Sequence, residues 1–297
     1  MNKKSLYIPN IHTNFMKNLY IFFILTFVLS CSQNDSDNTA KLLFKSGFEG
    51  AVEIIPNPNI DNIDFDVITG TDSETNFTWP ISILGSSENG GLHYIDDDNR
   101  QAIFSEIQTV IGHDGNPTKA LYSIENYQTN HTQCPYEITD LTEGKNDLYV
   151  KFWMKMDSES LHQIDKWRAI FEYKTKDYAA GTGYRFITYV YTDIHGNPYW
   201  HIQGDENPES AIWEYDNYDI PVPENQWFLT EFYWKWSDTN NGRTFWKINN
   251  QMVYDHHGAT TKNNKPIDFI ILTQIYGDAN PKHQWIDDIE IWDGLPE

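Results

Sequence analysis

Polar and titratable side chains alternate along three short strand-like runs in the middle of the chain. Glu172 and Lys174 lie two residues apart in the run WRAIFEYKT, Arg185 opens the run RFITYVYTD, and His201 and Gln203 lie two apart in NPYWHIQGD. Successive side chains of a strand point to opposite faces, so residues two apart share a face. Burying so many hydrogen-bonding groups without partners is costly. The pattern therefore predicts that one face of these strands lines a ligand-binding groove.

One chemistry open to these side chains is β-elimination on a uronate-containing polysaccharide. The reaction needs a group that neutralises the sugar carboxylate, a base that removes the C5 proton, and an acid that protonates the leaving oxygen. Lys174 and Arg185 are candidates for neutralising the carboxylate, together with Gln203 or Gln274. Glu172 lies on the same predicted face and is a candidate for binding the substrate.

Two residues are candidates for moving the proton. Tyr276 or His201 could be the base, and Tyr276 could also be the acid. A tyrosine has an ordinary pKa near 10, so it needs a nearby cation to act as a base at neutral pH. Lys174 or Arg185 on a neighbouring strand is the expected cation.

Aromatic residues make up 15% of the chain, with 11 Trp, 18 Tyr and 16 Phe. Flat rings cover the apolar faces of sugars with little loss of conformational entropy. Trp200 and Trp213 are therefore candidate sugar-stacking residues, and the alternative for both is packing between the sheets of the domain.

Each polar candidate also has a structural interpretation. Glu172 and Lys174 could form an ion pair on a solvated face, and Arg185 could be structural. His201 could be a hydrogen-bonded residue of the fold, and Tyr276 could lie at a sheet edge with its hydroxyl in water. A non-catalytic glycan-binding site would use the same residue types, so binding without cleavage is the alternative function.

Hydrolysis is the weaker enzymatic alternative. Retaining glycosidases place two carboxylates about 5 Å apart, commonly on one strand as Glu-x-Asp-x-Glu. The run FEYKT carries one acid, and the acids of DDIEIW lie near the end of the chain.

From residue 42 to residue 297 the sequence predicts one all-β domain, a two-sheet antiparallel β-sandwich of the jelly-roll type. Short runs rich in Val, Ile, Phe, Tyr and Trp, such as DLYVKFWMKM and WFLTEFYWKW, alternate with turns rich in Asn, Asp, Gly and Pro. This spacing is typical of β-sandwiches and barrels. About 255 residues are enough for one large hydrophobic core without a disulfide.

The two ends of this domain resemble the terminal strands of concanavalin A-like lectin/glucanase sandwiches. The resemblance rests on Phe48-Glu49-Gly50 in the opening strand and on the closing strand WIDDIEIW. The runs between them follow the order of jelly-roll polysaccharide lyases such as heparin lyase I-like and glucuronan lyase-like proteins. The resemblance implies the same fold and a polysaccharide substrate, with no organic cofactor.

The chain departs from these lyases at two motifs. Where they carry a glutamine and a histidine two residues apart, this chain has Glu172 and Lys174. Where they carry Lys-x-Gly-x-Tyr, it reads Leu272-Thr273-Gln274-Ile275-Tyr276, which keeps only the tyrosine. The resemblance therefore implies a substrate site here more strongly than it implies the usual catalytic pair.

The resemblance also implies a structural calcium ion between the first and last strands. Glu49 and Asp287 stand at the matching positions, and oxygen-only ligands suit Ca²⁺. Asp287, Ile289 and Ile291 are spaced by two along the predicted strand, so Asp287 should face the core as the two isoleucines do. A buried lone carboxylate is costly. A hydrogen-bonded Asp287 without an ion is the alternative.

The N-terminal 30 residues are predicted to be a signal peptide. The apolar run from residue 19 to residue 29 has 11 residues, too few to span a bilayer, and it ends just before Ser30 and Cys31. This resembles a bacterial lipoprotein signal, with Cys31 as the lipidated residue and residues 31–41 as a polar tether; Met16 is an alternative start. A lipid-anchored protein of the outer membrane, at the cell surface or in the periplasm of a Gram-negative bacterium, is expected.

The predicted mature chain is strongly acidic. Residues 1–30 hold three of the 21 basic residues and none of the 43 acidic ones, so 18 basic and 43 acidic residues remain, a net charge of −25. This charge argues against binding to nucleic acid, and against contact with an anionic membrane other than through the lipid.

Overall fold

In the computed structural model, the residues described are 40–60, 63–81, 92–93, 103–126, 137–139, 147–175, 178, 180–181, 183–207, 211–262, 267–272 and 275–297. They belong to one compact unit. The predicted signal peptide, the tether to residue 39, Cys31 and Gln274 lie outside the described residues.

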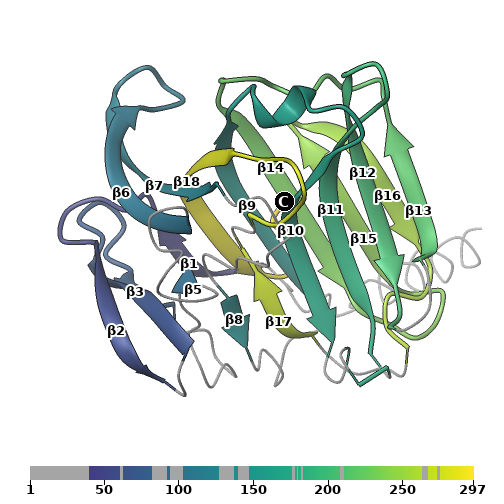
Figure 1. Ribbon diagram of the computed structural model, residues 1–297. Helices are drawn as coiled ribbons and strands as arrows, with labels where there is room; N and C mark the ends of the chain where they lie inside the picture. The colour runs from purple at the N-terminus through teal and green to yellow at the C-terminus, as the bar shows by residue number, and fades with distance from the viewer. Residues whose placement is uncertain are drawn as a thin grey trace, which may run out of the picture. The chain divides into compact units, whose positions relative to one another are not determined.

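The described chain is built almost entirely of β-strands (Figure 1). The strands are β1 Lys41–Ser46, β2 Glu53–Ile60, β3 Ile63–Thr71, β4 Thr78–Trp79, β5 Leu92–His93, β6 Ile103–Ile111, β7 Pro117–Glu125, β8 Glu137–Thr139, β9 Asp147–Met156, β10 Trp167–Thr175, β11 Arg185–Thr192, β12 Pro198–Asp205, β13 Ala211–Asn217, β14 Phe228–Lys235, β15 Arg243–Ile248, β16 Gln251–His257, β17 Ile267–Ile271 and β18 Lys282–Asp293. A short 3₁₀ turn, η2, spans Ser160–His162.

Two large antiparallel sheets organise the domain. The eight-stranded sheet has the order β16-β15-β14-β9-β18-β7-β6, with β1 paired to β18. The six-stranded sheet has the order β13-β12-β11-β10-β17-β8. A smaller sheet of β2, β3 and β4, with β5 paired to β3, completes the described strands. Strands far apart in sequence are neighbours in both large sheets, as in a sandwich with long crossovers.

The core lies between the two large sheets. Phe171 of β10 stacks on Phe232 of β14 with ring centroids 4.0 Å apart. Trp200 of β12 meets Trp246 of β15 edge to face at 5.0 Å. These rings are fully buried, and each pair joins one sheet to the other. The prediction of an all-β, two-sheet antiparallel sandwich is confirmed.

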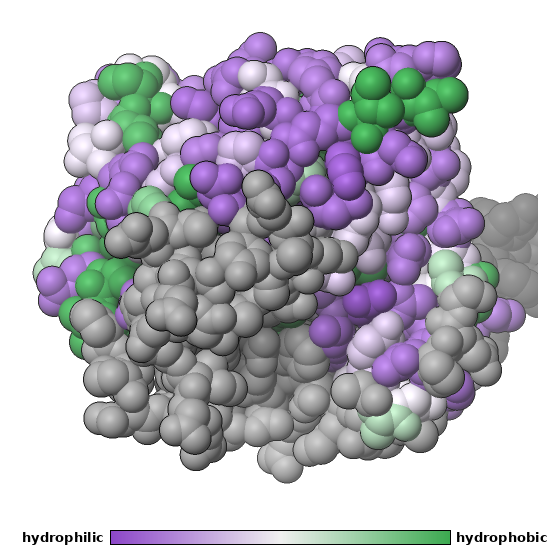
Figure 2. Space-filling model, in the orientation of Figure 1, coloured by the Kyte–Doolittle hydropathy of each residue, from purple (hydrophilic) through white to green (hydrophobic). Residues whose placement is uncertain are grey.

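The surface of the described residues is mainly polar. Figure 2 shows hydrophilic residues over most of the coloured part of the face in view, with separate hydrophobic patches between them. The described part of the chain holds no helix with the length and apolar character needed to cross a membrane.

Candidate functional site

The candidate site is the face of the six-stranded sheet that points away from the core, called the outer face below. Strands β10, β11 and β12 lie side by side there (Figure 1), and their registers align the side chains in rows. The rows are Trp167–Tyr191–Tyr199, Ala169–Tyr189–His201–Asp216, Glu172–Ile187–Gln203–Glu214 and Lys174–Arg185–Asp205. The first is called the aromatic row and the last the charged row. Arg185 and Tyr191, their residues on β11, are six positions apart, which is about 20 Å along an extended strand.

A β-bulge in β10 sets which residues reach the outer face. The pairing of β10 with β11 shifts between Ala169 and Phe171, so one extra residue occupies that strand. Strict alternation from Glu172 would have placed Arg168 outside. Instead, Trp167 and Ala169 pair with outer-face residues of β11, and Arg168 is 99% buried, bonded to Asp157, Ser160 and Gln284.

Together with Glu172 of the adjacent row, the charged row brings two cations against two buried carboxylates. Lys174 Nζ lies 2.7 Å from Glu172 Oε1, and Arg185 Nη1 lies 3.6 Å from the same oxygen. Arg185 also donates from Nε and Nη2 to Asp205 Oδ2, at 3.0 and 2.7 Å. The carboxylate side chains are 1 and 4% exposed, whereas those of Lys174 and Arg185 are 20 and 21% exposed.

This arrangement favours the charged form of Arg185. Burial opposes the positive charge, but Glu172 and Asp205 together raise the pKa of the guanidinium above its ordinary value. Glu172 and Lys174 do form the ion pair that was the alternative interpretation. Glu172, however, is buried rather than solvated. The ion pair therefore anchors the partly exposed Lys174 on a carboxylate beneath the outer face.

Tyr178 completes the charged row and was not singled out from the sequence. Its hydroxyl donates to Asp205 Oδ1 at 2.5 Å, and its ring centroid lies 5.0 Å from Arg185 Cζ and 5.5 Å from Lys174 Nζ. Burial and the hydrogen bond to Asp205 raise the pKa of the phenol, which keeps it protonated. Tyr178 follows β10 in the chain, and no strand periodicity marks its direction.

His201 lies between the charged and aromatic rows. Its Nδ1 is 2.7 Å from Asp216 Oδ1, and its Nε2 is 3.3 Å from Gln203 Oε1. Gln203 in turn donates from Nε2 to Asp205 Oδ2 at 2.7 Å. Asp216 fixes the ring through Nδ1. The Gln203 carbonyl can only accept, so its bond to His201 forms when Nε2 carries a proton. Asp216 was not predicted, because it lies on β13, beyond the three runs that carried the pattern.

Tyr276 lies at the aromatic end of the outer face. Its carbonyl accepts a hydrogen bond from Ala169 N at 2.6 Å, and its ring meets Trp167 edge to face at 4.9 Å. Ala169 is five residues from Lys174 along β10, about 17 Å. Lys174 is engaged by Glu172, at the other end of the strand. The expectation that Lys174 or Arg185 activates Tyr276 is therefore not supported by this geometry.

The two predicted stacking tryptophans do not lie on the outer face. Trp200 is fully buried between the sheets, so its ring has no surface to offer a sugar, and that prediction is wrong. Trp213 pairs with Gly204, which faces inward, and its ring stacks on His256 of β16 at 4.4 Å. It closes the sandwich edge and does not belong to the rows described above. Alternation itself separates Trp200 from His201, since adjacent residues point to opposite faces.

Glu49 and Asp287 do lie close together. Thr118 Oγ1 is 3.1 Å from Glu49 Oε1 and 3.2 Å from Asp287 Oδ2. Burial, with Asp288 and Glu49 nearby, raises the pKa of Asp287 to about 7. A Cβ on Gly47 would come within 3.3 Å of carboxylate oxygens of Asp287 and Asp288. Two or three carboxylates around a small residue fit a hard cation such as Ca²⁺.

The metal expectation is not decided by this arrangement. Within the described ranges, no group of three or more His, Cys, Asp or Glu side chains has the spacing of a metal site. Part of the Glu49 carboxylate is already used, because Lys119 N donates to its Oε1 at 2.7 Å. Calcium binding stays a prediction.

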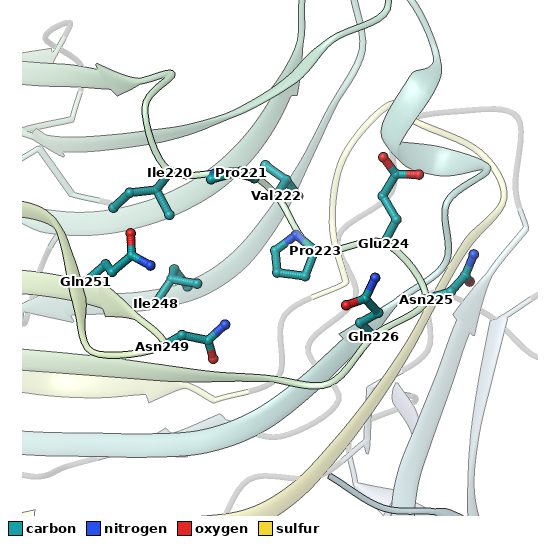
Figure 3. A pocket seen from close by; sticks show the side chains of 10 residues that line it. All are labelled: Ile220, Pro221, Val222, Pro223, Glu224, Asn225, Gln226, Ile248, Asn249 and Gln251. Atoms are coloured by element: carbon teal, nitrogen blue, oxygen red, sulfur yellow. The ribbon is translucent and has the colours of Figure 1, made fainter.

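One described hollow lies away from the outer face. Its volume is about 580 Å³, and it is formed by the loop between β13 and β14 and by the turn between β15 and β16 (Figure 3). Figure 3 labels its lining residues, which are Ile220, Pro221, Val222, Pro223, Glu224, Asn225, Gln226, Ile248, Asn249 and Gln251. None of the predicted site residues is among them.

Comparison with known proteins gives similarity only at the level of solved structures. No protein-family model matches the chain, and no curated protein matches it. The alginate lyase Aly36B is 12% identical, with 65% of this chain and 84% of that chain covered and a TM-score of 0.49.

Two further lyases are similar to a comparable degree. The endo-β-1,4-glucuronan lyase from the fungus Trichoderma reesei is 12% identical over 71% of this chain and 92% of that chain, with a TM-score of 0.48. The PL-14 alginate lyase from Aplysia kurodai is 9% identical over 65% and 88%, with a TM-score of 0.44. At these identities and scores, the similarities assign neither a family nor a reaction to this chain.

Proposed function

We propose that this chain is a polysaccharide lyase, which cleaves a uronate-containing polysaccharide by β-elimination on the outer face of the six-stranded sheet. The charged row carries the proposal. Arg185 has five N–H donors, and the bonds to Asp205 engage its Nε and Nη2. Buried carboxylates fix the direction of both cations, and their partly exposed ends are positioned to meet a carboxylate.

Gln203 connects this anion site to the base. Its amide nitrogen bonds to Asp205 in the charged row, and its carbonyl lies 3.3 Å from His201 Nε2. A uronate carboxylate beside Arg185 and the Gln203 amide directs the neighbouring C5 proton towards His201. The role of His201 is to accept that proton at Nε2; the new Nε2–H then donates to the Gln203 carbonyl, and Asp216 stabilises the imidazolium.

The leaving oxygen requires an acid at the aromatic end of the site. Tyr276 is one candidate, and Tyr191 is a second, since its ring lies 4.7 Å from the ring of His201. Both belong to one cluster with Tyr189 on the outer face. A phenol that stays protonated near neutral pH is suited to donating a proton rather than to removing one.

A glycan-binding protein without catalysis is the second candidate function. It is favoured by the charge balance of the charged row, in which Glu172 and Asp205 offset Lys174 and Arg185. A balanced site holds a carboxylate by directed hydrogen bonds with little long-range attraction. Such a site suits retention of a glycan as well as turnover.

One assay separates the two functions. The protein is incubated with a panel of uronate polysaccharides, and the ultraviolet absorbance of the unsaturated product is followed. Rising absorbance that is abolished by His201→Gln supports the lyase. Retardation in affinity gels without any absorbance change supports the binding protein. Tyr276→Phe and Tyr191→Phe, tested separately, identify the acid by loss of turnover with binding retained.

The proposed site of action is the cell surface or the periplasm, with the chain anchored to the outer membrane through a lipid on Cys31. The support is the apolar run before Cys31 and the polar tether after it. Mass spectrometry of the mature N-terminus tests this, and an unmodified Cys31 would exclude the anchor.

A further inference from the structure

Five aromatic rings lie together at one end of the outer face. Trp167 and Tyr191 stack with centroids 6.3 Å apart, and Tyr191 lies 6.0 Å from Tyr199. Tyr199 stacks on Tyr218 at 4.4 Å, just past the end of β13, and Tyr276 meets Trp167 at 4.9 Å. The aromatic row therefore runs across β10, β11 and β12 and continues to Tyr218.

Part of this aromatic surface is open to solvent. Tyr218 is 64% exposed, although one face of its ring is covered by Tyr199. Trp167, Tyr191, Tyr199 and Tyr276 are partly exposed. Ring faces and edges of this kind make large contacts with the C–H faces of a pyranose.

The charged groups around the aromatic row are mainly acidic. Tyr218 donates its hydroxyl to Asp216 Oδ2 at 3.3 Å, and desolvation, the charge of Asp216 and, to a smaller extent, that of Asp193 raise the pKa of Tyr218. Trp167 N donates to Asp278 Oδ1 at 2.8 Å, and Lys166 pairs with the same carboxylate at 3.4 Å. Glu214 lies two rows away on β13. A sugar carboxylate placed here would be repelled, whereas uncharged hydroxyl groups would find hydrogen-bond acceptors.

The charged row has the opposite preference, and it is about 20 Å away along the strands. That separation is longer than a single sugar unit, so the two rows contact different residues of one glycan. Lys174 and Arg185 suit a carboxylate, and the aromatic row suits an uncharged ring.

We propose that the aromatic row is a subsite for an uncharged sugar residue, so that the preferred glycan carries uronate and neutral residues in one chain. This rests on the proposed function for the position of the uronate, while the neutral subsite stands on the aromatic row itself. A homopolymer of uronate would place a carboxylate beside Asp216 and would bind less tightly.

The test compares Tyr218→Ala with Tyr215→Ala. Both tyrosines are exposed, but Tyr215 stacks on Tyr254 of β16 at 4.8 Å and pairs with the inward-facing Ile202. Tyr215 therefore lies outside the aromatic row and serves as a matched control. Unchanged unfolding temperatures show that each variant folds.

Binding is measured by calorimetry with alginate oligosaccharides and with a panel of mixed oligosaccharides from gellan, glucuronoxylan and xanthan. The expected result is that at least one mixed oligosaccharide binds about tenfold more tightly than alginate of equal length, and that Tyr218→Ala removes about tenfold of that affinity. Tyr215→Ala should change neither the affinity for alginate nor the affinity for the mixed oligosaccharides. Equal affinities for alginate and the mixed panel, no binding to any mixed member, or the same loss with both variants would overturn the subsite.

Product absorbance in the same samples separates this inference from the lyase proposal. Mixed-glycan binding that depends on Tyr218 without product formation contradicts the lyase and supports the subsite. Product formation from alginate that is unaffected by Tyr218→Ala, with no preference for mixed glycans, supports the lyase and contradicts the subsite.

Discussion

Arg185 takes its position from the register of three strands. Its neighbours in the charged row are Lys174 on β10 and Asp205 on β12, and Glu172 lies two residues from Lys174. The guanidinium thus lies between two buried carboxylates and compensates both. Removing one partner of such a buried group costs far more than the pair contributes, because the remaining charges lose their compensation.

The first prediction compares Arg185→Met with Arg243→Met. Arg243 forms a similar two-bond contact with Asp255, on β15 and β16, but both partners are more exposed. We expect Arg185→Met to lower kcat/KM at least 100-fold and to destabilise the fold by about 3 kcal/mol. Arg243→Met should cost about 1 kcal/mol or less and leave activity intact.

Urea unfolding and steady-state kinetics check this prediction. Equal losses of activity in the two variants would show that Arg185 acts only through stability. Retained activity in Arg185→Met would remove the charged row from the mechanism.

The second prediction concerns Asp216, which holds His201 at Nδ1. Asp216→Asn keeps the shape of the side chain but removes the charge that stabilises protonated His201. We expect kcat to fall about tenfold to 100-fold, with KM changed less than threefold. Steady-state kinetics of the wild type and the variant at one fixed pH check this expectation.

Glu214→Gln is the control for Asp216→Asn. Glu214 is the next outer-face residue of β13 and pairs in register with Gln203. An equal effect of both substitutions would mean that net charge on β13, rather than the contact with His201, controls the reaction.

At the scale of the elements, strand alternation explains which parts of the site could be predicted from sequence. The period of two placed Glu172 with Lys174 on one face and His201 with Gln203 on one face, and the structure brings both pairs, with Arg185, to the outer face. Alternation does not predict the face of a residue where regular strand pairing ends. The bulge between Ala169 and Phe171 brings Trp167 outward, and one sequence does not reveal a bulge because it changes no residue type.

Partners that arrive from distant segments were also missed. Tyr178 and Asp216 reach the outer face from a turn and from the next strand, so only the fold brings them to Asp205 and His201. Trp200 and Trp213 were chosen for their residue type, and the requirement for a filled core between the sheets places both rings inward.

The third prediction concerns the junction of β1 and β18. The buried carboxylate of Asp72 fixes the turn after β1 by accepting hydrogen bonds from Ser46 Oγ, Gly47 N and Glu49 N. This turn brings Glu49 to within bonding distance of Thr118, which also contacts Asp287. A divalent cation there would offset the repulsion between the two carboxylates.

We therefore expect calcium to raise the unfolding temperature by several degrees and EGTA to reverse the increase. Asp287→Asn should abolish the response. Magnesium serves as the control, because it prefers a smaller and more regular site. An unfolding temperature that is the same in calcium and in EGTA would exclude the ion.

At the scale of the whole molecule, two carboxyl groups in different places respond to pH in the same way. Glu125 on β7 is fully buried with Lys282, and burial raises its pKa to about 7. Asp287 on β18 has a pKa raised to about 7 by burial and by Asp288. Their ordinary values are 4.5 and 3.8. Between about pH 4.5 and pH 7 the folded protein therefore binds protons that the unfolded chain has lost.

The last prediction follows from the sign of this difference. Stability falls with rising pH wherever the folded state binds more protons, so the protein in EGTA should lose stability from pH 5 to pH 7 and level off above. Each group contributes at most about 1.4 kcal/mol per pH unit. The net charge of −22 for the whole chain adds a repulsion that also lowers stability as the pH rises. The slope of unfolding free energy against pH in the wild type therefore does not by itself identify the groups.

Urea unfolding at several pH values should give a shallower slope of unfolding free energy against pH for the Glu125→Gln, Asp287→Asn double variant. Calcium should remove the contribution of Asp287 to the wild-type slope, because it holds that carboxylate ionised. Parallel slopes for the wild type and the double variant would assign the pH dependence to general repulsion.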